Sequence, residues 1–266
     1  MKHILVPIGI SPDSHHTLQY AVDFAAEFSS KIFLMEVFSV SVGAGKSLVN
    51  VEQKVAESGK ERLKEVIDKI DSKEVEIKIA SYNGDIVDGL KEIDEELGID
   101  LIILAPRSND ITEELFLGNT SGRMIKRTNI PALIVPRGST LQPLRTILTA
   151  FKSGILKRKR ILDPLLTIKS KFDAKVNLLL VKTPGYSDDD LKVNTALMDI
   201  SSQLTLTEAP NTYLGVLEHF QSQQPDLLRV FRRKRGFFKN LWEKNTVLKA
   251  EFAARIPVLV LSVKKD

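Results

Sequence analysis

Gly118, Asn119 and Thr120 are the residues of this sequence whose types and spacing best suit phosphate binding. They begin a stretch in which apolar residues recur at helical spacing, so they stand at a predicted helix start. Backbone N–H groups point outward there, and a glycine lets an anion approach the chain closely. Asn119 would equally serve as an ordinary helix cap. The motif therefore predicts either a phosphate site or a plain helix start.

A second candidate for ligand binding is the basic segment between the predicted strand that begins at Asp226 and Trp242. Basic side chains among aromatic ones can bind phosphates and stack on bases. One short cluster is a weak signal, however, and a cationic loop facing solvent or an acidic surface explains it better. We therefore do not expect nucleic acid as the partner. The charged residues of the segment are Arg232, Arg233, Lys234, Arg235 and Lys239.

Other chemical motifs are incomplete. Gly43-Ala-Gly-Lys-Ser47 resembles the end of a phosphate-binding P-loop, but Val40 stands where the first glycine of that motif belongs. The chain has no cysteine, and its four histidines form neither a zinc peptidase motif nor part of a hydrolase motif. We therefore predict no catalytic residues and no metal ligands.

The composition is that of an ordinary globular protein, with 43% hydrophobic and 27% charged residues in 266. No apolar run reaches the ~18–20 residues of a membrane span, and residues 1–30 lack the pattern of a secretory signal. These features predict a cytoplasmic protein without a membrane partner.

The elements that must position these motifs occur twice. Asp100-Leu-Ile-Ile-Leu104 and Ile130-Pro-Ala-Leu-Ile-Val135 correspond, at a constant offset of 126, to Asp226-Leu-Leu-Arg-Val230 and Ile256-Pro-Val-Leu-Val-Leu261. The repeat predicts one domain at residues 1–140 and a second at 144–266, joined by a stretch that contains Gly, Ser and Pro.

Within each repeat, strand-length apolar runs alternate with helical patterns. This alternation predicts the α/β class, as two tandem doubly wound domains with parallel sheets of Rossmann-like type. Ligands of such sheets bind at the carboxyl ends of the strands. In the first repeat we expect strands at Ile4–Ile8, Ile32–Val37, Val75–Ala80, Leu101–Leu104 and Ala132–Val135, and helices at Ser14–Phe28, Leu48–Ile70, Ile86–Leu97 and Asn119–Thr128.

The whole chain resembles a tandem pair of universal stress proteins, whose fold is that of the adenine nucleotide alpha hydrolases. The resemblance rests on the strands "ILVP" from Ile4, "DLIIL" from Asp100 and "IPALIV" from Ile130. Members that bind ATP carry G-x2-G-x9-G-[ST] after the fourth strand and an Asp after the first. Here Ala105, Ser108, Gly118 and Asn119 occupy the motif positions, and Gly9 replaces the Asp.

The resemblance implies a stress-response or regulatory protein that is not an enzyme and whose nucleotide binding is weak or vestigial. An ATP-binding member with slow hydrolysis, or a module for an acidic partner or nucleic acid, is the alternative. Any ligand would be ATP or AMP with magnesium, bound by the first repeat. The candidate nucleotide-binding residues are Pro7, Gly9, Val37, Arg107, Ser108, Gly118, Asn119 and Thr120.

The resemblance also implies how the repeats assemble, because family members pair through their last strands. We expect Ala132–Val135 and Val258–Ser262 to pair within one chain and form an internal pseudo-dimer, which would protect two apolar strand edges. Residues 1–140 hold 16 basic and 22 acidic residues, whereas residues 141–266 hold 22 and 12, so we expect their opposite net charges to help the halves meet. A homodimer of chains and an unidentified protein partner complete the expected interactions.

Overall fold

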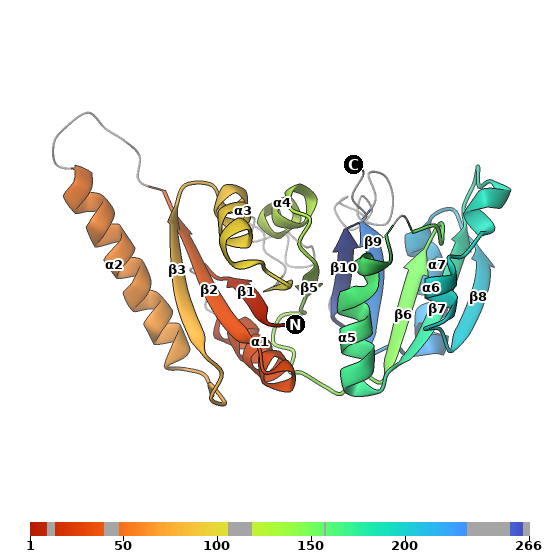
Figure 1. Ribbon diagram of the computed structural model, residues 1–266, viewed down its shortest axis with the longest axis horizontal. Helices are drawn as coiled ribbons and strands as arrows, with labels where there is room; N and C mark the ends of the chain where they lie inside the picture. Colours follow the sequence, from red (N-terminus) through yellow and green to blue (C-terminus); the bar gives the residue numbers. More distant parts are fainter. Residues whose placement is uncertain (10–13, 40–47, 106–118, 157, 233–255, 263–266) are drawn as a thin grey trace. The chain divides into compact units, whose positions relative to one another are not determined.

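The computed structural model groups the chain into two compact units, one of residues 1–104 with 137–141 and one of residues 105–136 with 142–266. The predicted boundary at residues 137–143 divides the sequence repeats, whereas the compact units assign residues 105–136 to the second unit. The residues that the structure describes are 1–9, 14–39, 48–105, 119–156, 158–232 and 256–262 (Figure 1).

The first unit contains a parallel sheet in the strand order β3-β2-β1-β4. Where helices cover both faces of this sheet, its strands consist almost wholly of apolar residues. All four residues of Leu101–Leu104 are buried. The bounds are β1 His3–Pro7, β2 Lys31–Phe38, β3 Ile77–Asn83 and β4 Leu101–Leu104.

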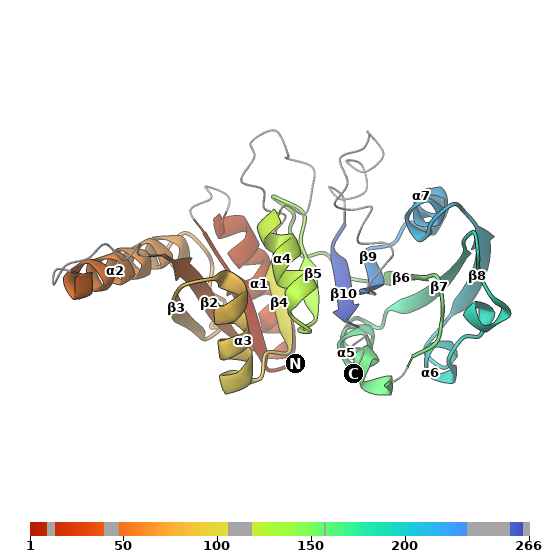
Figure 2. The same ribbon diagram turned by 90° about the horizontal axis from the view of Figure 1, so that it is seen from above.

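Three helices, α1 (Ser14–Phe28), α2 (Leu48–Ile67) and α3 (Ile86–Leu97), connect these strands. Figure 2 shows α1 and α3 on opposite faces of the sheet. A Cβ atom added at Gly89 of α3 would lie 2.6 Å from the side chains of both Met35 and Tyr82, so this helix packs closely on β2 and β3. The expected doubly wound arrangement is therefore present.

The second unit contains six strands in the order β5-β10-β9-β6-β7-β8. All neighbouring pairs are parallel except β5 and β10, which pair antiparallel with Leu133 opposite Leu259. The last strands of the two sequence repeats therefore pair with each other. The bounds are β5 Ala132–Ile134, β6 Thr146–Phe151, β7 Lys175–Lys182, β8 Gln203–Glu208, β9 Leu227–Arg232 and β10 Val258–Ser262.

The helices of the second unit differ most from those of the first at the connection between β7 and β8. There only a short 3-10 helix and the four-residue α6 stand where the first repeat has the twenty-residue α2. Figure 2 shows α5 and α7 on opposite faces of the sheet. The bounds are α4 Asn119–Arg127, η1 Lys159–Leu162, α5 Asp163–Phe172, η2 Asp188–Leu191, α6 Thr195–Met198 and α7 Thr212–Gln223.

Two predicted elements of the first repeat differ from the structure by two or three residues at their ends, and the third strand begins at Ile77 rather than Val75. The third strand runs to Asn83 because Tyr82 and Asn83 still pair with Val37 and Phe38 of β2. Helix α2 ends at Ile67 rather than Ile70, and the turn that follows contains Lys73 and Glu74 with positive φ angles. Pairing with β2 and the geometry of the turn determine these ends. The apolar periodicity of the sequence indicates neither of them.

Candidate functional site

Pro7, Gly9 and Val37 of the candidate site lie at the carboxyl edge of the first unit's sheet. Pro7 is the last residue of β1, and the following N–H, of Ile8, donates to the carbonyl of Met35 at 2.8 Å. Val37 is the penultimate residue of the neighbouring parallel strand β2 and is half-buried. The parallel pairing of β1 and β2 therefore brings these predicted residues to one edge.

A hydrogen bond joins the loop after β1 to the first residue of helix α1. The Ser14 hydroxyl, at the first position of α1 and almost fully buried, donates to the Gly9 carbonyl at 2.8 Å. The Gly9 carbonyl thus already accepts a hydrogen bond, and Gly9 contributes no side chain. At residue 9 the chain therefore offers a ligand only backbone, where an Asp would have supplied a carboxylate.

The other predicted residues belong to the start of helix α4 and to the segment before it. Asn119 and Thr120 are the first two residues of α4, as expected. The next residue, Ser121, is fully buried and donates its hydroxyl to the Ala105 carbonyl at 2.9 Å, which ties the first turn of the helix to the residue that follows β4. Arg107, Ser108, Gly118 and the side chain of Asn119 lie outside the described residues.

The equivalent loop of the second repeat, after β6, is covered by the chain itself. Asn194 donates its N–H to the Gly154 carbonyl at 3.0 Å, and a Cβ atom at Gly154 would lie 2.8 Å from the Cα of Val193. Asp190 sits beside this loop, and its pKa is lowered chiefly by the N–H group of Ser187. The segment before α6 therefore occupies the surface of this loop.

Arg232, predicted to belong to a basic patch, has a structural role within the second unit. Its guanidinium donates to the carbonyl of Lys126 at 2.5 Å and to the Asn129 side chain at 2.9 Å, and its Nε donates to the Ser262 hydroxyl at 2.9 Å. Burial lowers the pKa of Arg232. It thus joins the ends of β9, β10 and α4. Arg233, Lys234, Arg235 and Lys239 lie outside the described residues.

Two buried charged residues were not among the predicted site residues. Glu36 of β2 is 6% exposed and accepts from the Arg62 guanidinium of α2 at 2.7 Å. Arg229 of β9 is fully buried, and its guanidinium carbon lies 3.3 Å from the centre of the Phe231 ring. The available signal was a charged residue inside an apolar strand, because such a position requires compensation in the fold.

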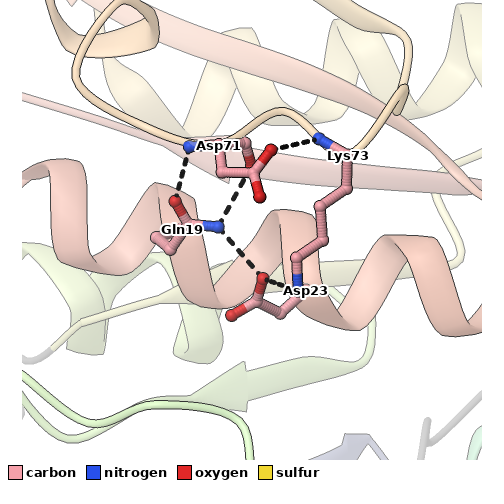
Figure 3. A network of polar contacts seen from close by, with 4 residues as sticks. All are labelled: Gln19, Asp23, Asp71 and Lys73. Carbon is pink, nitrogen blue, oxygen red and sulfur yellow. Dashed lines mark hydrogen bonds and ion pairs between the residues drawn. The ribbon is translucent and has the colours of Figure 1, made fainter.

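A polar network in the first unit fixes the turn before β3 to helix α1 (Figure 3). The Gln19 amide donates to the Asp71 carbonyl at 3.1 Å and accepts from its N–H at 2.8 Å, while Lys73 pairs with Asp23 at 2.8 Å. The bond from Asp23 raises the pKa of Lys73. These four residues hold a turn in place at the edge opposite to the candidate site.

Neither a metal cluster nor a membrane-spanning helix is found in the part of the chain that the structure describes. There, no group of three or more His, Cys, Asp or Glu side chains is placed to hold a metal ion. Over the same residues, no helix combines the length and the apolar character that crossing a bilayer requires.

Comparison with known proteins matches residues 1–136 to the universal stress protein family. A universal stress protein of Methanocaldococcus jannaschii is 26% identical over 140 residues, which are 51% of this chain and 82% of the relative. Universal stress protein G of Shigella flexneri is 26% identical over 141 residues, 50% of this chain and 98% of the relative. The crystal structure of a universal stress protein from Archaeoglobus fulgidus has the same fold over 98% of both chains, with a TM-score of 0.70 at 16% identity.

Proposed function

Because the chain belongs to the universal stress protein family, we propose that it is a cytoplasmic stress-response or regulatory protein, not an enzyme, whose first repeat binds adenine nucleotide weakly. The nucleoside would lie against Pro7, Gly9 and Val37, and the phosphates, with magnesium, against the start of α4 and the preceding Arg107, Ser108 and Gly118. The internal pseudo-dimer forms part of this proposal, and the antiparallel pairing of β5 and β10 supports it.

One observation carries the prediction of weak binding. At the end of β1, Gly9 has no side chain, and its carbonyl already accepts from the Ser14 hydroxyl. Residue 9 therefore supplies no carboxylate acceptor for a ribose or base, whereas ATP-binding members of the family have an Asp at this position. Losing a hydrogen bond to a charged group costs about 1.5–3 kcal/mol, or roughly a tenfold to more than hundredfold loss of affinity.

Two features support placing the site in the first repeat. Helix α4 follows a glycine in the sequence, and the N–H groups of a helix's first turn suit phosphate. In the second repeat the loop after β6 is covered by Val193 and Asn194, and a lysine, Lys152, follows that strand. A ligand would have to displace this covering segment.

Calorimetric titration of the full chain with Mg-ATP tests the proposal. We expect weak binding to the unmodified chain and binding at least about tenfold tighter in Gly9→Asp, because the variant supplies the missing acceptor. Lys152→Asp, at the equivalent position of the second repeat, is the matched control and should leave affinity unchanged. Submicromolar binding by the unmodified chain, or an equal gain in both variants, would contradict the proposal.

Release of inorganic phosphate during the same incubation separates binding from hydrolysis. We expect no release above that of protein-free Mg-ATP. Turnover that increases in Gly9→Asp would favour the alternative of a slow ATPase.

A further inference from the structure

The outer strand of the second unit's sheet, β8, has features that the corresponding strand of the first unit lacks. Figure 1 shows β8 as the outermost strand of its sheet, and among the described residues it pairs only with β7. Its outer edge therefore presents backbone groups that pair with no other strand of the described residues, and such an edge is a template for another strand. Leu204 and Leu206 are 41% and 57% exposed and, being two residues apart, lie on one face.

The first unit shows what normally covers this face. In the first unit, Ile79 and Ser81 of β3 pair with Leu34 and Glu36 of β2. Leu204 and Leu206 of β8 pair with β7 in the same way, so they lie on the corresponding face of their sheet. Helix α2 covers that face of the first unit, where its Gly59 approaches Glu36. In the second repeat η2 and α6 replace this helix and leave both leucines exposed.

We propose that β8 is the surface through which two copies of this chain associate, by antiparallel pairing of β8 with β8. With the two-fold axis at Thr205, Leu204 lies opposite Leu206 of the second copy, and the reverse pair is identical. Opposite residues in such a pair point to the same face, so four leucines gather where a covering helix is missing. In this register odd-numbered residues lie opposite odd-numbered residues, and even-numbered opposite even-numbered. The backbone groups of alternate residues point outward, so the outward groups of the two strands face each other.

Charge agrees with this register. Glu208 is the charged residue of β8, and it pairs with Lys182 at 2.6 Å. In the proposed pair it lies opposite Ser202, so no like charges oppose each other across the axis. Shifting the axis by one residue in either direction leaves a leucine of each copy opposite Ser202 or Glu208. The strand is therefore complementary to itself in one register.

The small size of the surface sets the strength of the expected association. One six-residue strand from each copy buries less than the ~1,200–2,000 Å² of a standard stable interface, which places this contact in the weak class. We therefore expect a dimer whose population rises with protein concentration, visible in sedimentation velocity of the full chain.

The absence of cysteine from the chain permits a direct test of the register. In Thr205→Cys the two thiols face each other across the axis, at Cα separations of about 4.5–5.5 Å that a disulfide bridges. In the matched control Thr207→Cys, which is also half-buried on β8, the Cα atoms lie about 14 Å apart and cannot be bridged. Mild oxidation of the full chain should give a covalent dimer with the first variant and not with the second.

Placing charges on the leucines tests the apolar contribution. Leu204→Lys combined with Leu206→Lys, in the Thr205→Cys background, should abolish cross-linking, whereas Leu166→Lys at an exposed leucine of α5 should not. Circular dichroism of each variant confirms that it is folded. Equal cross-linking of the two cysteine variants, cross-linking that survives the lysines, or a chain that sediments as a monomer at every concentration would overturn the proposal.

Discussion

Asp100 and Asp226 perform the same task in the two repeats, at residues separated by the repeat offset of 126. The Asp100 carboxylate accepts the N–H groups of Lys2 and His3, at 2.5 and 3.1 Å, where β1 begins. The Asp226 carboxylate accepts those of Arg145 and Thr146, both at 2.8 Å, where β6 begins. Both residues lie at the amino edge of their sheets, away from the candidate site, so this shared feature serves stability.

We expect Asp226→Ala to reduce the free energy of unfolding by about 1–3 kcal/mol, because two backbone donors lose a charged acceptor. Urea unfolding followed by circular dichroism measures the loss. Asp226→Asn keeps one acceptor oxygen and should lose less. An alanine variant as stable as the unmodified chain would show that solvent replaces the carboxylate without cost.

Tyr20 predicts a dependence of stability on alkaline pH. Its side chain is 1% exposed, and its hydroxyl has no hydrogen-bond partner among the described residues. Burial, and then the charge of Asp23, raise the pKa of Tyr20 above its ordinary value. The unfolded chain therefore loses the Tyr20 proton at a lower pH than the folded chain does. The contribution of Tyr20 to stability is complete below pH ~10 and decreases as the pH rises above that value.

Tyr20→Phe should be as stable as the unmodified chain or more stable at pH 8, because it removes a buried unpaired hydroxyl. The loss of stability between pH 8 and pH 10.5 should become smaller in urea titrations. It should not vanish, because burial raises the pKa of Tyr213 to about 12. Tyr186→Phe, at a 37% exposed position, is the control and should keep the full decrease.

At the scale of elements, the helix before the fourth strand of each repeat begins and packs in the same way. Asp85 caps α3 and Asn211 caps α7, each through a side-chain oxygen that accepts an N–H group of the first turn. Gly89 and Gly215 then bring these helices against the sheet. All four residues obey the offset of 126, so the repeat extends further toward the amino terminus than the strand motifs alone indicate.

Gly89→Ala should destabilise the protein although alanine favours helices by about 1 kcal/mol over glycine. The added methyl group would lie 2.6 Å from both Met35 and Tyr82, and overpacking of this kind costs roughly 1–3 kcal/mol. Glu95→Ala, at an exposed position of the same helix, should change stability by less than about 0.5 kcal/mol. A rise in the thermal midpoint of Gly89→Ala would contradict the close packing of α3.

At the scale of the whole molecule, the two sequence repeats and the two compact units are different divisions of one chain. Strand β5 belongs to the first repeat by sequence, yet its antiparallel partner is β10 at the end of the second. Arg232 strengthens the same association, since its bonds reach Lys126 and Asn129 of the first repeat. A cut in the linker would therefore leave apolar strand edges on both fragments.

Fragments 1–140 and 144–266, produced separately and mixed, should bind each other, because β5 and β10 each complete the sheet edge of the other. Size-exclusion chromatography of the mixture should show a complex of the intact chain's size. Leu259→Asp in the second fragment, at a fully buried position of β10, should prevent it. Two fragments that remain monomeric after mixing would contradict the pseudo-dimer.

The α/β class, the tandem repeat and the order of strands and helices could be predicted from the sequence, because apolar periodicity and a constant repeat offset are visible in the order of residues. It also indicated that Pro7, Gly9 and Val37 share an edge, since strands of one parallel sheet end together. The clustered charges of the basic segment did not reveal the role of Arg232, whose hydrogen-bond partners at 126, 129 and 262 are distant in sequence.

Which surfaces are covered depends on tertiary contacts that the sequence does not show. The segment at Val193 and Asn194 closes the loop of the second repeat, and the short connection before β8 leaves Leu204 and Leu206 exposed. Both results depend on the path that the short connection between β7 and β8 takes across its sheet. The apolar periodicity of the sequence does not indicate that path. The partner of the buried Glu36 could not be predicted either, because Arg62 is 26 residues away in the sequence and the fold brings the two side chains together.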